Sequence, residues 1–196
     1  MDIFQSVECK TFIHRIDKNT NKELGIKMAE KHAYFAGGCF WCITPVFKIY
    51  GATEVVSGYS GGDEADPKYE DVKAKRTGHR ETIAVTYDSE KVDYAKLVEI
   101  YLANVDPFDE GGQYMDRGFS YTLAIYYQNE DEKAIAQKAI DALHHPQGKK
   151  AAVALEAFKS FYPAEEYHQD YYLKNPESFE NEISERRQWE QTHSPK

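Results

Sequence analysis

Cysteine is scarce in this sequence, with three among 196 residues. Three cysteines cannot build the disulfide framework of a small secreted domain. Basic residues are also in deficit, because 24 Lys and Arg face 33 Asp and Glu, which gives a formal net charge of -9. No run of five or more basic residues occurs. Such a chain is a poor partner for nucleic acid or for an anionic membrane.

Long apolar runs are missing as well. No stretch approaches the roughly 18 apolar residues that a membrane helix needs, and residues 1–31 contain no apolar core of the signal-peptide type. With 41% hydrophobic and 29% charged residues, the composition is typical of a soluble globular protein. We therefore expect a cytoplasmic, monomeric protein that binds neither membrane nor nucleic acid.

Hydrophobic patterning predicts the fold class. The predicted elements are strands at 32–36, 53–59, 80–87 and 120–127, and helices at 39–50 and 93–104. The order β-α-β-β-α-β is that of the split βαβ, ferredoxin-like arrangement. We expect an α+β protein with two layers, in which helices cover one face of a mainly antiparallel sheet. Additions follow toward the C-terminus: a helix at 130–143, a strand at 149–155 and a short helix at 164–173.

Composition and hydrophobic patterning divide the chain into three parts. Residues 1–31 are polar and weakly patterned, so we expect a partly ordered N-terminal extension. Residues 32–176 carry the strand and helix signals and form the expected main domain, which also contains the candidate residues for chemistry described below. Residues 177–196 are polar, and we expect an irregular C-terminal tail.

Cys39 and Cys42 are the first candidates for chemistry. They follow Gly37 and Gly38 at the point where a strand gives way to a helix. A helix N-terminus stabilises a thiolate, and a spacing of three residues places both sulfurs on one helix face. The pair is typical of thiol redox chemistry. Half of a metal site and two inert buried cysteines remain open, although a zinc site needs four ligands and no second C-x-x-C or H-x-x-x-H is found.

Six ordered segments resemble the A-type peptide-methionine sulfoxide reductases. They are GGCFW at 37–41, VSGYSGG at 56–62, PKYEDV at 67–72, TGHRE at 77–81, DRGFSY at 116–121 and FYPAEEYHQ at 161–169. The resemblance covers about residues 32–176. It implies an enzyme that returns the S epimer of methionine sulfoxide, free or in oxidised peptides and proteins, to methionine, and so repairs oxidative damage.

The resemblance also assigns roles to residues. It makes Cys39 the nucleophile that attacks the sulfoxide sulfur and Glu81 the acid that protonates the leaving oxygen, which requires burial to raise the Glu81 pKa. Tyr69 and Tyr121 match the tyrosines that hydrogen-bond the sulfoxide oxygen.

Three further positions match residues of the family's substrate site. Phe40 and Trp41 match the pocket for the terminal methyl group of the substrate, and Asp116 matches an acidic residue lining the site. Outside the substrate site, Glu166 and His168 match a C-terminal motif that we interpret as structural.

One departure from the family concerns regeneration. Many members carry glycine where this chain has Cys42, and resolve the sulfenic acid with cysteines near the C-terminus. No cysteine follows Cys42 here, so we expect a Cys39–Cys42 disulfide that thioredoxin, or dithiothreitol in vitro, reduces. Cys9 is a remote alternative. The resemblance implies no bound cofactor and no metal.

Two other classes of protein compete with this interpretation. A general thioredoxin-like disulfide oxidoreductase also uses C-x-x-C after a strand, but the order of elements and the aromatic pair between the cysteines argue against it. A non-enzymatic metal- or redox-sensing module would need more ligands nearby, and the histidines at 32, 79, 144 and 145 are too scattered. Nothing in the sequence resembles a B-type reductase domain, so we expect no activity on the R epimer.

Overall fold

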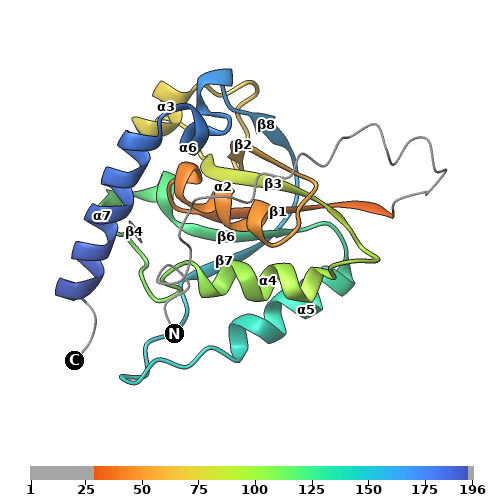
Figure 1. The fold of residues 1–196 in the computed structure, drawn as a ribbon. Helices are drawn as coiled ribbons and strands as arrows, with labels where there is room; N and C mark the ends of the chain where they lie inside the picture. Colours follow the sequence, from red (N-terminus) through yellow and green to blue (C-terminus); the bar gives the residue numbers. More distant parts are fainter. Residues whose placement is uncertain (1–28, 194–196) are drawn as a thin grey trace.

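A six-stranded sheet forms the centre of the computed structural model, which describes residues 29–193 (Figure 1). The strands are β1 (Glu30–Gly37), β2 (Glu54–Ser60), β3 (Arg80–Asp88), β6 (Leu123–Tyr127), β7 (Val153–Ala157) and β8 (Phe161–Pro163). Their order across the sheet is β7-β6-β1-β3-β2-β8. Only β6 and β7 pair in parallel, and the other neighbours are antiparallel.

The four strands β6-β1-β3-β2 confirm the expected ferredoxin-like core. The split βαβ unit requires β3 to lie between β1 and β2, as it does here. Helix α5 (Glu130–Asp141) then connects β6 to its parallel neighbour β7. The short strand β8 was not predicted, and it pairs with β2 at the opposite edge.

Helices α2 (Phe40–Ile49), α4 (Tyr94–Ala103) and α5 supply the second layer. Phe35 of β1 stacks on Phe47 of α2 and on Tyr101 of α4, with ring centroids 5.3 and 5.0 Å apart. The Asp93 side chain begins α4 by accepting a hydrogen bond from the backbone N–H of Lys96. This buried aromatic core packs α2 and α4 against the sheet.

One predicted boundary shifts where the chain approaches the site. The strand expected from residue 120 begins at Leu123, because residues 119–121 form the 3₁₀ turn η2 (Phe119–Tyr121) after Gly118, whose φ is 115°. The glycine-rich loop before it contains a small hairpin, β4 (Gly112–Gln113) and β5 (Asp116–Arg117). Short helical segments, α3 (Tyr69–Lys73), η3 (Glu166–His168) and α6 (Tyr171–Lys174), complete this end of the molecule.

The prediction of an irregular C-terminal tail at residues 177–196 is wrong. Residues Pro176–His193 form a helix, α7, which runs along one side of the molecule (Figure 1). Pro176 occupies the first helical position, where a missing N–H costs least, and Arg186 pairs with Glu190 one turn later at 3.2 Å. The division of the chain into three parts stays a prediction. Residues 1–28 lie outside the described part, and β1 begins at Glu30, two residues earlier than expected.

None of the helices formed by residues 29–193 has the length and apolar character needed to cross a membrane.

Candidate active site

Cys39 lies at the start of α2, immediately after the chain leaves β1. Gly38 makes this turn with a φ of 78°, and a Cβ atom there would come within 2.6 Å of the Cβ of Gln113. Glycine is therefore required for both conformation and space. The turn directs the sulfur of Cys39 toward a cavity of about 200 Å³.

All eight predicted site residues line this one cavity. They are Cys39, Phe40, Trp41, Cys42, Tyr69, Glu81, Asp116 and Tyr121. They come from α2, α3, β3, β5 and η2, which the fold brings to the same end of the sheet. The sequence motifs thus converge on one place, as a shared chemical task requires.

The two sulfurs belong to free, partly buried thiols. The backbone N–H of Cys42 donates to the carbonyl oxygen of Cys39 at 3.1 Å, so both residues belong to the first turn of α2. A hydrogen bond with Cys42, burial, and the charges of Glu81 and Asp116 raise the pKa of the Cys39 thiol well above its usual value. The helix N-terminus acts in the opposite sense, because its partial positive charge favours the thiolate.

Glu81 has the environment that a general acid needs. Its side chain is 2% exposed on β3, and one carboxyl oxygen accepts a hydrogen bond from the backbone N–H of Phe40 at 3.1 Å. Burial raises the pKa of Glu81 to about 8, with a further contribution from the charge of Asp116, while the hydrogen bond from Phe40 opposes the shift. At neutral pH this carboxyl is mostly protonated and can donate a proton.

Tyr69 and Tyr121 present phenol groups to the same cavity. Burial, followed by the charge of Glu81, raises the pKa of both hydroxyls. The two phenols therefore stay protonated and available as donors. The backbone N–H of Tyr69 is held by Glu165, whose carboxylate accepts it at 3.1 Å and also accepts the hydroxyl of Tyr59 at 2.9 Å.

Trp41 is held in place by the C-terminal motif. Its indole stacks on Tyr171 of α6 at a centroid distance of 3.7 Å. The indole N–H donates to Nδ1 of His168 at 3.2 Å. His168 is 1% exposed, and burial lowers its pKa to about 4, so it is a neutral acceptor.

Phe40 differs from Trp41 in being a core residue as well as a lining residue. It is 1% exposed and packs within 6.1 Å of the Tyr59 ring. In the C-terminal motif, Glu166 is exposed and pairs with Lys174, whereas Glu165 makes the internal contacts. Glu165, to which the sequence assigned no role, is therefore the glutamate of this motif that contacts Tyr69 and Tyr59.

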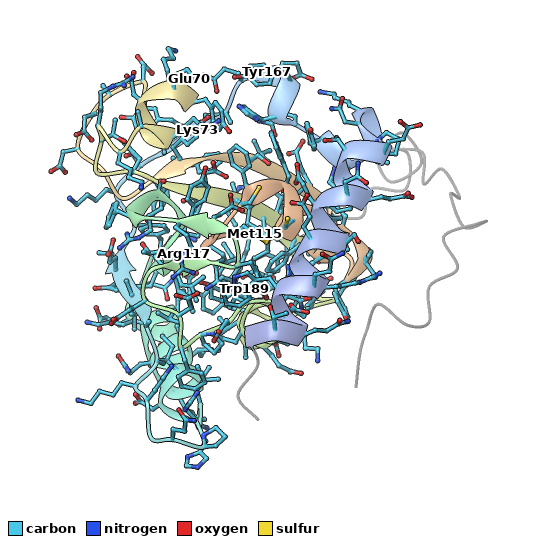
Figure 2. All side chains as sticks on the ribbon, turned by 90° about the vertical axis from the view of Figure 1, so that its left-hand side faces the viewer. Glu70, Lys73, Met115, Arg117, Tyr167 and Trp189 are labelled. Carbon is cyan, nitrogen blue, oxygen red and sulfur yellow. The ribbon has the colours of Figure 1, made fainter. Side chains whose placement is uncertain are left out.

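Sequence reasoning missed five lining residues. They are Tyr114, Met115, Glu182, Glu185 and Arg186. The last three belong to α7, which runs beside Met115 and carries Trp189 on the side shown in Figure 2. Acidic and basic residues in a polar segment look like ordinary solvated surface, so the sequence carried no signal for them.

Arg186 attaches α7 to the rim of the cavity. Its guanidinium donates to the hydroxyl of Tyr114 at 2.6 Å and to the carbonyl oxygen of Asn104 at 3.1 Å. It also lies 4.0 Å from the centroid of the Tyr114 ring, and Trp189 contacts the same ring edge-on at 5.6 Å. These contacts hold Glu182 beside the thiols, so that one oxygen of Glu182 and the sulfurs of Cys39 and Cys42 all lie within 4.8 Å of one another.

Comparison with known proteins agrees with this geometry. The family model described as peptide methionine sulfoxide reductase matches residues 31–195. A peptide methionine sulfoxide reductase of Bacillus licheniformis is 45% identical over 157 residues, which are 78% of this chain and 87% of that protein.

Solved structures give the same result. The reduced form of Mxr1 from Saccharomyces cerevisiae is 27% identical, with a TM-score of 0.71 over 76% of this chain and 87% of that one. Methionine sulfoxide reductase A of Corynebacterium diphtheriae is 26% identical, with a TM-score of 0.68 over 75% of this chain and 76% of that one. The resemblance found in the motifs is confirmed, and the chain belongs to the peptide methionine sulfoxide reductase family.

Proposed function

We propose that this protein reduces the S epimer of methionine sulfoxide, free or within oxidised peptides and proteins, to methionine. The observation that carries the proposal is the position of Glu81. A buried carboxyl whose pKa is about 8 accepts the backbone N–H next to Cys39 and shares its cavity. A nucleophile and a protonated acid on the same small cavity are what reduction of a sulfoxide requires.

In the first step, the thiolate of Cys39 attacks the sulfoxide sulfur. Glu81 gives its proton to the sulfoxide oxygen, and the hydroxyls of Tyr69 and Tyr121 stabilise the charge that develops on that oxygen. The oxygen is transferred to Cys39. The products are methionine and the sulfenic acid of Cys39, so the sulfoxide is reduced by two electrons and the thiol is oxidised by two.

The substrate is held by its methyl group. Phe40 and Trp41 line the cavity beside Cys39, and their aromatic faces suit a methyl group attached to sulfur. The stack of Trp41 on Tyr171 fixes the orientation of the indole. Asp116 lines the same cavity, where its charge helps to keep Glu81 protonated.

In the second step, the sulfur of Cys42 attacks the sulfenic acid. A Cys39–Cys42 disulfide forms and water leaves. A dithiol protein of the thioredoxin type, or dithiothreitol in vitro, then exchanges with this disulfide and restores both thiols. Both electrons pass through the sulfurs, so the cycle needs no bound cofactor. Cys9, which lies outside the described residues, is the alternative resolving residue.

The functional unit extends beyond residue 176 in this proposal, because α7 supplies part of the cavity wall. The cytoplasmic location and the monomeric state remain predictions.

One assay tests the function. The purified protein with dithiothreitol is given the separate S and R epimers of a methionine sulfoxide peptide, and methionine is measured. We expect turnover of the S epimer alone, and loss of that turnover in Cys39→Ser. An inactive wild-type protein, or a Cys39→Ser variant with full activity, contradicts the proposal.

A further inference from the structure

The thiol pair of α2 meets a carboxylate from the other end of the chain. One carboxylate oxygen of Glu182 and the sulfurs of Cys39 and Cys42 lie within 4.8 Å of one another. The three residues are partly buried, and α7 brings Glu182 to a place that sequence spacing did not indicate. A C-x-x-C pair alone offers two metal ligands, whereas this arrangement offers three.

The chemistry of these donors selects one class of cation. Two thiolates and a carboxylate suit Zn²⁺ and other thiophilic divalent cations, whereas Mg²⁺ and Ca²⁺ take six or more oxygens. Donors about 2.0–2.3 Å from a tetrahedral zinc lie about 3.5–3.8 Å apart. The observed separations are within 4.8 Å, so they need to contract by about 1.3 Å at most. Because the three residues line the cavity, water could supply a fourth ligand.

The electrostatics of the cavity also favour a cation. Besides Glu81, which is mostly protonated at neutral pH, its lining includes the carboxyl groups of Asp116, Glu182 and Glu185, against one guanidinium among the described residues, that of Arg186. This guanidinium is already engaged by Tyr114, Asn104 and Glu190. A divalent cation between the sulfurs and Glu182 would therefore enter a region of excess negative charge.

We propose that Cys39, Cys42 and Glu182 form a binding site for a thiophilic divalent cation of the Zn²⁺ type. Binding replaces the thiol protons, which are released to solvent, and involves no change of oxidation state. The bound cation occupies both sulfurs, so it excludes the sulfoxide substrate. A Cys39–Cys42 disulfide has no thiolates to offer, and only the reduced protein binds the cation.

Cobalt is the probe for this site. The reduced, full-length protein is titrated with Co²⁺, and sulfur-to-cobalt charge-transfer absorption is followed. We expect one Co²⁺ per chain, displacement by Zn²⁺, and no binding to the disulfide form or to Cys42→Ser. Absence of the charge-transfer absorption in the reduced wild-type protein overturns the proposal.

Matched substitutions on α7 test the third ligand. Loss of a residue that only hydrogen-bonds a metal ligand typically weakens metal binding 10- to 100-fold. Glu182 is itself a proposed ligand, so Glu182→Gln is expected to weaken metal binding at least about tenfold. Glu182→His supplies another zinc ligand and should restore binding. Glu185→Gln removes a neighbouring charge from the same helix and cavity and should leave affinity within about threefold. Equal affinity in Glu182→Gln and the wild type contradicts the site.

A second readout is independent of the reductase reaction. Zn²⁺ should protect both thiols from alkylation by iodoacetamide in the wild type, and much less in Glu182→Gln at the same concentration. Alkylation at an unchanged rate in the presence of Zn²⁺ counts against the site. Because absorption and alkylation require no sulfoxide, this proposal can fail while the proposed reductase activity stands, and the reverse also holds.

Discussion

The backbone N–H of Phe40 donates to the carboxyl group of Glu81 at 3.1 Å, across 41 positions of sequence. This hydrogen bond joins the first turn of α2, which presents Cys39, to the buried end of β3. It fixes the distance between the proposed nucleophile and the proposed acid.

Replacement of Glu81 by glutamine should remove the proton donor and keep the shape of the side chain. The amide oxygen can still accept the N–H of Phe40, so the fold of the site should survive. We expect kcat for methionine sulfoxide reduction to fall by about 10²- to 10⁴-fold, the range for loss of a general acid. The measurement is the rate of methionine formation from the S epimer, in a single turnover for the chemical step and in the steady state for kcat.

The matched control for this substitution is Glu166→Gln, which alters an exposed glutamate paired with Lys174. It should leave kcat unchanged. Wild-type kcat in Glu81→Gln would remove this residue from the role of acid.

The pH dependence of the reaction should contain a limb that belongs to Glu81. The acid acts when protonated, and its pKa is raised to about 8. Activity that depends on this proton is therefore present below pH 8 and lost as the pH rises through about 8. The raised pKa of Cys39 acts oppositely, because more thiolate forms at higher pH. We expect the kcat/KM profile of the wild type to include a descending limb near pH 8 that is missing in Glu81→Gln.

The raised pKa of Glu81 also predicts how the stability of the folded protein depends on pH. The pKa of Glu81 is about 8 in the folded protein and near its ordinary value of 4.5 in the unfolded chain. The folded state thus binds the proton more tightly, and its contribution to stability is present below pH 4.5 and falls as the pH rises toward 8. Urea unfolding should show that Glu81→Gln gains stability relative to the wild type between pH 5 and pH 8. A constant difference between the two proteins contradicts the shift.

Substitution of Cys42 by serine should separate the two halves of the cycle. Cys39 can still attack the sulfoxide, so one equivalent of methionine per protein is expected, with the sulfenic acid of Cys39 left behind. Turnover driven by thioredoxin should fall by at least about tenfold. Rapid quench experiments and trapping of the sulfenic acid by dimedone measure the two effects.

Cys9→Ser is the control for the resolving cysteine, and it should cycle normally. If Cys42→Ser cycles with thioredoxin at the wild-type rate and Cys9→Ser does not, the resolving residue is Cys9.

Tyr171 should act on the substrate through Trp41. The two rings stack at 3.7 Å with an interplanar angle of 7°. Tyr171→Leu removes the aromatic platform, and loss of such a pair costs about 0.5–1.5 kcal/mol. If that cost falls on substrate binding, KM rises by about two- to tenfold. Tyr171→Phe keeps the stack and should keep KM, whereas equal KM values for Phe and Leu would show that the stack does not position the indole.

Sequence patterns predicted the elements whose side chains alternate or repeat against a large core. The helix at 93–104 and the strand at 80–87 are examples, because burial on one or both faces leaves a period in the sequence. Strand β8 left no such signal. It spans only Phe161–Pro163 and is defined by pairing with β2, a contact made about 100 positions away.

In the site, the motif residues could be predicted from the sequence, whereas the residues contributed by α7 could not. Cys39, Glu81 and the two tyrosines could be named because their motifs match a family, and the cavity brings them together. Glu182 and Arg186 could not, since the polar sequence of α7 has little amphipathic pattern. The contacts that place this helix, such as that between Arg186 and Tyr114, depend on the folded shape of the whole chain.

The hydrogen bond from Trp41 to His168 spans 127 positions, and this span has a consequence for biosynthesis. Domains begin to fold from the N-terminus while the chain is still being made. Both cysteines leave the ribosome early, but the indole between them gains its acceptor only after residue 168 has emerged, and its stacking partner three residues later. A nascent chain that already contains the thiols but lacks residues 168 and 171 therefore holds Trp41 without its hydrogen bond and its stack, and we expect it to bind substrate less tightly than the finished protein.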